Sequence, residues 1–201
     1  MTPNQIWQSL KRGNERFVHQ AATRPNQDLA RRAALTTGQE PKAVVLACSD
    51  SRVPVELVFD QGLGDVFVVR TAGEIVDQAV LSSLEYAVDG LHTPLIVVMG
   101  HESCGAVKAA AGVLAGKPMP GGFQRVLIEK VSPSIAAAQA SGLTQISEFE
   151  THHISEVVDF IISCSPTIRG AFKDGRLGII GARYRLADGA VEPVIAVGVD
   201  L

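Results

Sequence analysis

Short apolar runs alternate with segments of helical periodicity along most of the chain, and this pattern predicts the fold class. Three runs read as strands buried on both faces of a sheet: Ala43–Ala47, Val66–Arg70 and Leu95–Met99. Apolar residues at helical spacing predict helices between and after these runs: a short one before Val66, then residues 77–88, 104–114, 123–139 and 146–163. Strands that alternate with helices indicate an α/β protein with a mostly parallel central sheet flanked by helices.

The two ends of the chain depart from this alternation. The segment Thr2–Gln5 has a capping residue, a proline and a glutamine at the positions that begin a helix, and residues 28–37 suit a second, short helix. Near the other end, the apolar stretches 177–184 and 191–199 flank an Asp-Gly pair, which is typical of two strands joined by a tight turn. We therefore expect one domain over residues 1–201, with an N-terminal helical arm (about 1–38) and a C-terminal strand pair.

Composition and charge narrow the classes of function. Of the 201 residues, 46% are hydrophobic, which suits one globular domain with a sizeable core. The formal net charge is −3, and no Lys/Arg cluster is interleaved with aromatic residues, so we expect no nucleic-acid partner. The N-terminal segment lacks the apolar stretch of a signal peptide, and no run approaches the ~18 apolar residues of a membrane span. These features predict a cytoplasmic protein with no membrane partner.

Three residues with the chemistry of zinc ligands follow two of the expected strands. Cys48 directly follows the first strand, His101 comes just after the third, and Cys104 stands three positions later. If the first and third strands are neighbours, these side chains meet beyond the carboxyl ends of the strands, where open parallel sheets bind ligands. Two thiolates and one imidazole suit Zn²⁺, and three protein ligands leave its fourth position open. The spacing alone also fits two buried cysteines and a loop histidine.

An acidic and a basic residue beside the first cysteine strengthen the metal hypothesis. The carboxylate of Asp50 can accept a hydrogen bond from a zinc-bound water, and Arg52 can hold that carboxylate in place. Without a metal, the two residues would be a surface ion pair at a strand end. The third cysteine, Cys164, has no ligand partner nearby in the sequence and is expected to be a free thiol, because an odd count argues against a disulfide framework.

At these residues the sequence resembles the β-class carbonic anhydrases. The resemblance rests on ACSDSRV at 47–53, DQGLGDVFVVR at 60–70, SLEYAV at 83–88 and GHESCGAV at 100–107, and it is dense from about 39 to 113. It implies one Zn²⁺ per chain and the reversible hydration of CO2 to bicarbonate and a proton. It also implies that Cys48, His101 and Cys104 are the ligands and that Asp50 and Arg52 act beside the metal.

The resemblance further implies a substrate pocket and an oligomer. Gln39 matches a glutamine that reaches in from a neighbouring subunit, Phe67 and Tyr86 match apolar pocket walls, and Gly105 matches a position whose backbone N–H lies near the substrate. Taken alone, Gln39 would be a solvated loop residue, the two aromatic residues would be core, and Gly105 would be a helix-packing residue. A cleft between subunits makes a dimer the smallest active unit, in a dimer or tetramer, with the N-terminal arm packing on a partner.

The sequence departs from the family's pattern at two positions. Glu74 stands where many members have Asn. Val45 takes the place of a Trp that, in some bacterial members, forms a non-catalytic bicarbonate site with residues resembling Arg70 and Tyr184, so we expect such inhibition to be weak or absent. In part of the family, the acid at the position of Asp50 moves onto zinc as a fourth ligand at lower pH. The short tether to Cys48 makes this closed state a hypothesis here.

Other interpretations of the same residues remain open from the sequence. Cys48 could be the nucleophile of a thiol enzyme, although Asp50 within its loop would repel an anionic substrate and raise the thiol pKa. The same fold and zinc site could instead act on another small linear substrate, such as carbon disulfide. The chain could also be a non-catalytic zinc-binding or interaction protein. The pair His152-His153 falls in an expected amphipathic helix and is predicted to lie on a solvated face, as are His19 and His92.

Overall fold

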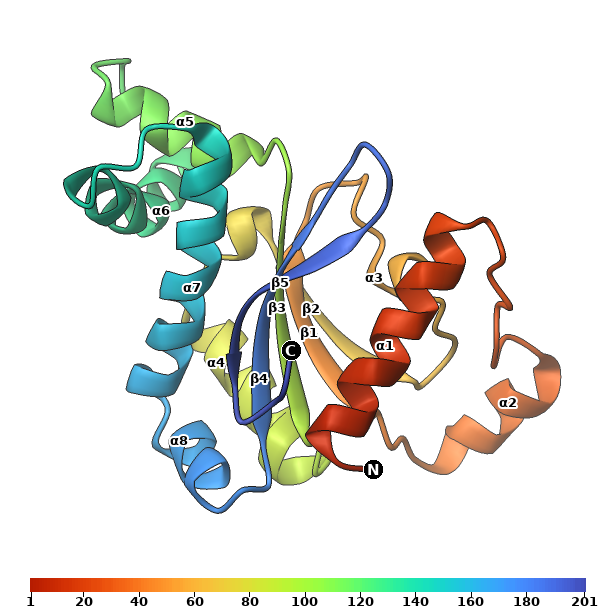
Figure 1. Cartoon of the computed structure of the whole chain (residues 1–201). Coiled ribbons are helices and arrows are strands. Elements are labelled where there is room, and N and C mark those ends of the chain that lie inside the picture. The colour runs from red at the N-terminus through yellow and green to blue at the C-terminus, as the bar shows by residue number, and fades with distance from the viewer.

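The computed structural model describes all 201 residues and contains one five-stranded sheet with helices on both faces (Figure 1). The strand order is β2-β1-β3-β4-β5, parallel except for the antiparallel pair β4–β5. The strands are β1 (Ala43–Cys48), β2 (Val66–Thr71), β3 (Leu95–His101), β4 (Gly178–Tyr184) and β5 (Val191–Val197). The mostly parallel sheet and the C-terminal strand pair predicted from the apolar runs are therefore confirmed.

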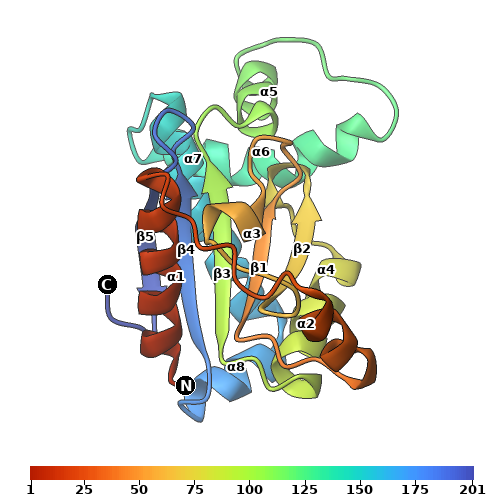
Figure 2. The same ribbon diagram turned by 90° about the vertical axis from the view of Figure 1, so that its right-hand side faces the viewer.

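Helices cover both faces of this sheet. They are α1 (Pro3–Val18), α2 (Leu29–Ala34), α3 (Val55–Val58), α4 (Gln78–Glu85), α5 (Gly105–Leu114), α6 (Gln124–Ala140), α7 (Ile146–Cys164) and α8 (Pro166–Lys173), with short turns η1 (Leu35–Thr37), η2 (Ala72–Glu74) and η3 (Tyr86–Gly90). Figures 1 and 2 show α1 and α3 on one face and α4, α7 and α8 on the other, while α5 and α6 lie beyond one end of the strands. The sequence pattern missed α8, although the Ser165 cap and the proline after it are helix-start signals.

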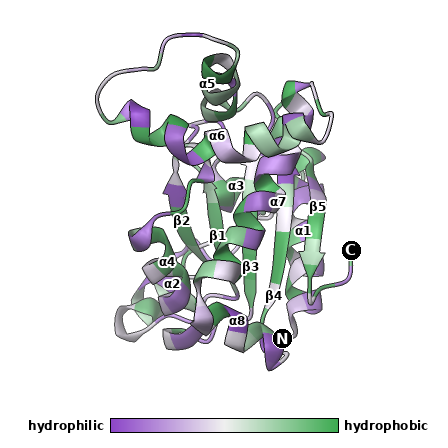
Figure 3. Cartoon of the chain, turned by 90° about the vertical axis from the view of Figure 1, so that its left-hand side faces the viewer, coloured by the Kyte–Doolittle hydropathy of each residue, from purple (hydrophilic) through white to green (hydrophobic).

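The strand pattern follows from burial on both faces. In β1, Val44 and Leu46 join the core under α4, α7 and α8, whereas Ala43, Val45 and Ala47 join the core under α1 and α3. Burying a side chain of this kind contributes roughly 1.5–3 kcal/mol, so a polar residue at any of these positions would be costly. Figure 3 shows the consequence, since the central strands are mostly green while the helices that cover them mix green and purple.

The two helices of the N-terminal arm differ in how far they are buried in their own chain. Helix α1 buries Ile6, Trp7 and Leu10 in the core of its own chain, against the sheet. Helix α2, by contrast, buries none of its residues. The arm's first helix therefore belongs to this chain's fold, and packing of the rest on a partner subunit stays a prediction. None of the helices combines the length and the apolar character that a membrane span requires.

The strand order places the carboxyl ends of β1 and β3 side by side. Strand β1 pairs with β2 on one side and with β3 on the other, both in parallel, so the chain changes direction across the sheet between β1 and β3. Ala47 of β1 is level with Met99 of β3, which brings the residues that follow them to the same edge. Parallel sheets bind ligands at this kind of switch point, beyond the carboxyl ends of the strands.

Candidate metal centre

Three potential ligand atoms meet at this edge of the sheet. Cys48 is the last residue of β1, His101 is the last residue of β3, and Cys104 is the cap residue that precedes α5. The two sulfurs and a ring nitrogen lie within 4.8 Å of one another, and all three residues are buried. The chain turns from β3 to α5 through Ser103, whose φ of 61° is left-handed. This sharp turn lets two ligands three positions apart face the same point.

The ring of His101 is oriented as a metal ligand requires. Its Nδ1 lies 2.8 Å from the backbone oxygen of Glu102, which can only accept, so Nδ1 carries the hydrogen. The lone pair is then on Nε2, which is buried and has no hydrogen-bond partner. Leaving such a group unsatisfied costs about 1–3 kcal/mol. A metal ion between Nε2 and the two sulfurs would remove that cost, so the residues fit zinc.

The two thiols strongly affect each other's ionisation. The Cys104 thiol, His101 and the backbone N–H of Gly73, which lies 3.2 Å from Cys48 Sγ, lower the pKa of Cys48 although burial opposes them. The hydrogen bond from the Cys104 thiol to the Cys48 sulfur, followed by burial, raises the pKa of Cys104. These opposite shifts favour one thiolate in the metal-free pair, and a bound dication would displace the proton of the second thiol. The expectation that Asp50 raises the pKa of Cys48 is therefore wrong, because the surrounding donors outweigh it. Burial of Cys48 beside a second thiol, and not its pKa, argues against the thiol-enzyme interpretation.

Asp50 is held beside this centre by Arg52. The guanidinium donates from Nε to Oδ1 at 2.9 Å and from its terminal nitrogen to Oδ2 at 2.7 Å, and the Arg52 backbone N–H donates to Oδ1 at 3.0 Å. These contacts hold the pKa of Asp50 well below its usual range. Asp50 Oδ2 lies 3.9 Å from His101 Nε2. The carboxylate is therefore ionised, fixed and next to the candidate ligands; its movement onto zinc at lower pH stays a prediction.

Comparisons with known proteins agree with this geometry. The sequence model of a family described as carbonic anhydrase matches residues 43–191. Carbonic anhydrase 2 of Mycobacterium tuberculosis is 48% identical over 187 residues, which cover 93% of this chain and 90% of that protein. A carbonic anhydrase of Mycolicibacterium smegmatis is 50% identical over 190 residues, covering 94% and 92%. The chain belongs to the β-carbonic anhydrase family.

The fold comparison supports the same membership. A tetrameric β-carbonic anhydrase from Sordaria macrospora superposes with a TM-score of 0.72 at 25% identity, covering 96% of this chain and 98% of that one. The resemblance to the β-class carbonic anhydrases, first seen in the sequence motifs, is thus confirmed.

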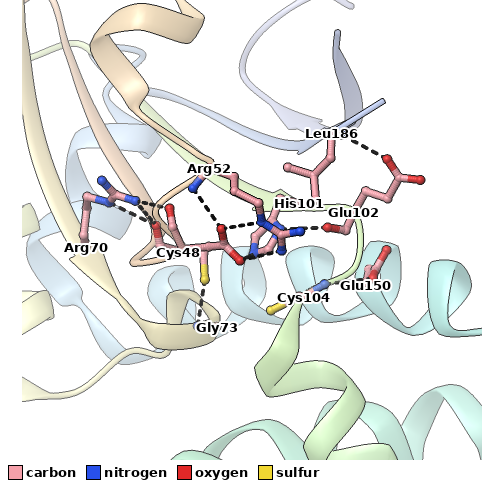
Figure 4. A network of polar contacts seen from close by, with 10 residues as sticks. Cys48, Arg52, Arg70, Gly73, His101, Glu102, Cys104, Glu150 and Leu186 are labelled. Atoms are coloured by element: carbon pink, nitrogen blue, oxygen red, sulfur yellow. Dashed lines mark hydrogen bonds and ion pairs between the residues drawn. The ribbon is translucent and has the colours of Figure 1, made fainter. Parts of the chain in front are cut away.

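A buried ion pair supports Cys104 of this carbonic anhydrase. Glu150 Oε1 of α7 accepts from the Cys104 backbone N–H at 3.2 Å, and its Oε2 accepts two bonds from the Arg183 guanidinium of β4, at 2.8 and 3.1 Å. Glu102 Oε2 accepts from the Leu186 N–H at 2.9 Å and ties the adjoining turn to the end of β4 (Figure 4). These contacts leave no signal in the sequence, because a helical pattern does not indicate which acidic side chain turns toward a distant strand.

Arg70 fixes the backbone of the first ligand. Its guanidinium donates to the Cys48 backbone oxygen at 3.0 and 2.8 Å and to the Asp50 backbone oxygen at 2.7 Å (Figure 4). Arg70 therefore lies against the loop that carries Cys48 and Asp50, while Tyr184 is buried in the core under α1. The expected weakness of bicarbonate inhibition, drawn from Val45, stays a prediction.

The predicted pocket residues lie in two places. Gln39 and Tyr86 line a surface hollow with Leu35, Leu63 and Leu91, and none of the candidate ligands lines it. Tyr86 is 54% exposed, so it is not core in the single chain; its ring centre lies 6.2 Å from that of the partly buried Phe67. Gly105, in contrast, directly follows Cys104 at the start of α5. Of the four predicted pocket residues, only Gly105 directly adjoins a candidate ligand within the single chain. The substrate roles of all four residues stay predictions.

Two residues near the centre were not placed correctly by their sequence context: Glu74 had no assigned place, and His153 was expected at the surface. Glu74 is buried with its Oε2 unpartnered, and burial, followed by the charges of Cys48 and Glu150, raises its pKa well above the usual value. His153 was predicted to lie on a solvated face, and this is wrong, because it is only 3% exposed. The adjoining His152 is partly exposed and lies 3.5 Å from Glu156. The packing of α6 over α7 covers one of these two neighbours and leaves the other at the surface.

Proposed function

We propose that this carbonic anhydrase binds one Zn²⁺ through Cys48, His101 and Cys104 and catalyses the reversible hydration of CO2 to bicarbonate and a proton. The single observation that carries the proposal is the buried, unpartnered Nε2 of His101, which faces two sulfurs at the switch point of the sheet. When bound, zinc acts as a Lewis acid that makes a coordinated water acidic enough to react near neutral pH.

Asp50 and Arg52 prepare the reacting water in this proposal. With the metal bound, Asp50 would accept a hydrogen bond from the reacting water and so orient the lone pair of that water toward the carbon of CO2. Arg52 keeps the carboxylate ionised and prevents it from rotating, because it holds both carboxylate oxygens. Arg70 restrains the same loop from its backbone side. The Gly105 N–H, at the start of α5, is the proposed donor near the substrate.

The complete pocket is proposed to need a second copy of the chain. Gln39 and Tyr86 are exposed in the single chain and line a hollow beside β2, an edge strand whose residues are mostly half-buried. An edge strand with uncovered apolar side chains favours coverage by another subunit. We therefore propose a homo-oligomer with a dimer as its smallest active unit, in which Gln39 of one subunit completes the pocket of the other and Phe67 and Tyr86 form its apolar walls.

Stopped-flow CO2 hydration tests this function. Purified protein should accelerate hydration, should lose the activity when a chelator removes the metal, and should regain it with zinc. Asp50→Ala should keep zinc and fold while activity falls about 100-fold or more, the scale of a lost proton-handling group. Asp159→Ala, an exposed acid of α7, is the matched control and should retain full activity. Zinc-loaded protein without CO2 hydration, or full activity in Asp50→Ala, would contradict the proposal.

A further inference from the structure

The backbone of Gly73 is held from both sides, through its N–H in one peptide unit and its carbonyl in the next. On the side of the metal centre, its N–H donates to Cys48 Sγ at 3.2 Å (Figure 4). On the other side, its carbonyl oxygen lies 2.9 Å from His153 Nε2. Gly73 sits in the η2 turn with a left-handed φ of 65°, and a Cβ there would lie 2.6 Å from the Cβ of Ala106. The turn that faces the sulfur is thus tightly enclosed, and only glycine fits it.

The tautomer of His153 follows from its neighbours. A carbonyl oxygen can only accept, so Nε2 of His153 carries the hydrogen that Gly73 receives. Nδ1 of a neutral ring then accepts. The hydroxyl of Ser134 on α6 lies 2.6 Å from this nitrogen and 2.8 Å from the Val131 backbone oxygen, so its one hydrogen is shared between these two acceptors. Both residues are buried, and burial lowers the pKa of His153, which favours the neutral ring. Both nitrogens are occupied, so His153 is neither a metal ligand nor free to carry protons.

We propose that His153 is a positioning residue for the metal centre: its Nε2–H holds the Gly73 carbonyl so that the Gly73 N–H stays directed at the Cys48 sulfur. The inference rests on the proposed zinc site. A hydrogen bond to a ligand thiolate fixes the position of the sulfur and disperses its charge. Outer partners of metal ligands typically change metal affinity or activity about 10–100-fold when they are removed. Through Ser134, His153 and Gly73, the helices α6 and α7 thereby set the geometry of a ligand on β1.

Isosteric variants of His153 test this role. His153 and Ser134 line a cavity of about 230 Å³, so truncation would enlarge a void and confuse packing with hydrogen bonding. His153→Leu removes the donor but keeps bulk, whereas His153→Gln keeps an N–H donor at a similar reach. The control is His152→Leu, since His152 makes no contact with Gly73. Zinc affinity by chelator competition and the sulfur-to-metal absorption bands of the Co²⁺-substituted protein are the two measurements.

We expect His153→Leu to weaken zinc binding about 10–100-fold and to shift the Co²⁺ bands, while His153→Gln and His152→Leu stay near wild type. A folded His153→Leu with unchanged affinity and bands would overturn the inference, as would a His153→Gln that behaves like His153→Leu. If His153→Leu does not fold, Ser134→Ala is measured instead. It should shift both measurements in the same direction by a smaller amount, and no shift would overturn the inference.

Two further results separate this inference from the proposed function. Long-range ¹H–¹⁵N spectra should show the Nε2–H tautomer of His153 in the zinc-loaded wild type, and the Nδ1–H tautomer would overturn the inference alone. A wild-type protein that binds zinc and hydrates CO2, with His153→Leu unaffected in affinity and spectrum, would likewise reject the positioning role and leave the function standing. A wild-type protein that binds no zinc would reject both.

Discussion

The buried pair of Glu150 and Arg183 is the contact beside the metal centre whose loss can be converted into a stability change. The Glu150 side chain is 2% exposed and the Arg183 side chain 15%, with 2.8 Å between the nearest charged atoms. Glu150→Ala would leave the guanidinium buried without a counter-charge and the Cys104 N–H without an acceptor. Breaking such a buried pair costs about 3–5 kcal/mol.

This cost is large compared with the stability of the whole domain. Native domains are stable by roughly 5–15 kcal/mol, and for this chain length each kcal/mol lowers Tm by about 2–4 °C. Glu150→Ala should therefore lower Tm by about 6–20 °C. The exposed pair of Arg125 and Glu129 on α6, whose nearest charged atoms are 2.6 Å apart, supplies the control, because exposed helix pairs are worth only about 0.3–0.5 kcal/mol.

The assay is urea unfolding of metal-free protein, followed by circular dichroism, for wild type, Glu150→Ala, Glu150→Gln and Glu129→Ala. Working without metal separates the loss of the ion pair from any loss of zinc. Glu150→Gln should fall between wild type and Glu150→Ala, because its amide oxygen can still accept from Cys104. If Glu150→Ala costs no more than Glu129→Ala, the pair does not support the Cys104 loop and the reasoning is refuted.

Two further predictions concern acid stability and the Gly73 turn. Burial alone would raise the pKa of Asp60, but hydrogen bonds from Thr23, Arg16 and Arg24 outweigh it and lower the pKa to about 2 from 3.8. The unfolded chain then binds more protons than the folded chain between about pH 4 and pH 2, so about 2 kcal/mol of stability should be lost as pH falls through this window. In Asp60→Asn, the free energy of unfolding should depend less on pH in this window. An equal pH dependence in the variant and the wild type would contradict the prediction. Gly73→Ala should lower the free energy of unfolding by about 1–3 kcal/mol and weaken zinc binding. Gly116→Ala should have smaller effects, because Gly116 also has a left-handed φ but a Cβ there would meet no atom within 4 Å. Equal effects of the two glycine variants in unfolding and zinc titration would argue against the tight enclosure of Gly73.

Much of the fold could be predicted because burial on both faces leaves a direct trace in sequence. The central strands β1 and β3 had to be continuous apolar runs, and both are buried throughout. The remaining run also became a strand, but the expectation of burial on both faces is wrong for it, because β2 lies at the edge of the sheet and is mostly half-buried in the single chain. The candidate ligands could also be found, because Cys48 and His101 each stand at a strand end and Cys104 follows at a short, regular spacing. The one assumption, that the first and third strands are neighbours, holds in the sheet.

The contacts that support the ligands could not be predicted in this way. His152 and His153 are adjacent on α7, and a helical pattern cannot tell which of them the later packing of α6 will cover. Glu150 and Arg183 are far apart in sequence and meet only after α7 crosses β4. Taken alone, Tyr86 would be core because it is aromatic within an apolar segment, yet it is 54% exposed in the single chain. Long-range packing decides all three cases, and local periodicity does not record it.

X-ray absorption at the zinc edge of the purified protein tests the central claim most directly. The account predicts one zinc per chain with two sulfur ligands at about 2.3 Å and one imidazole nitrogen at about 2.0–2.1 Å, together with a light atom in the fourth position. Cys48→Ser should remove one sulfur from this shell. An active protein that contains no zinc, or a zinc shell without sulfur, would contradict the account.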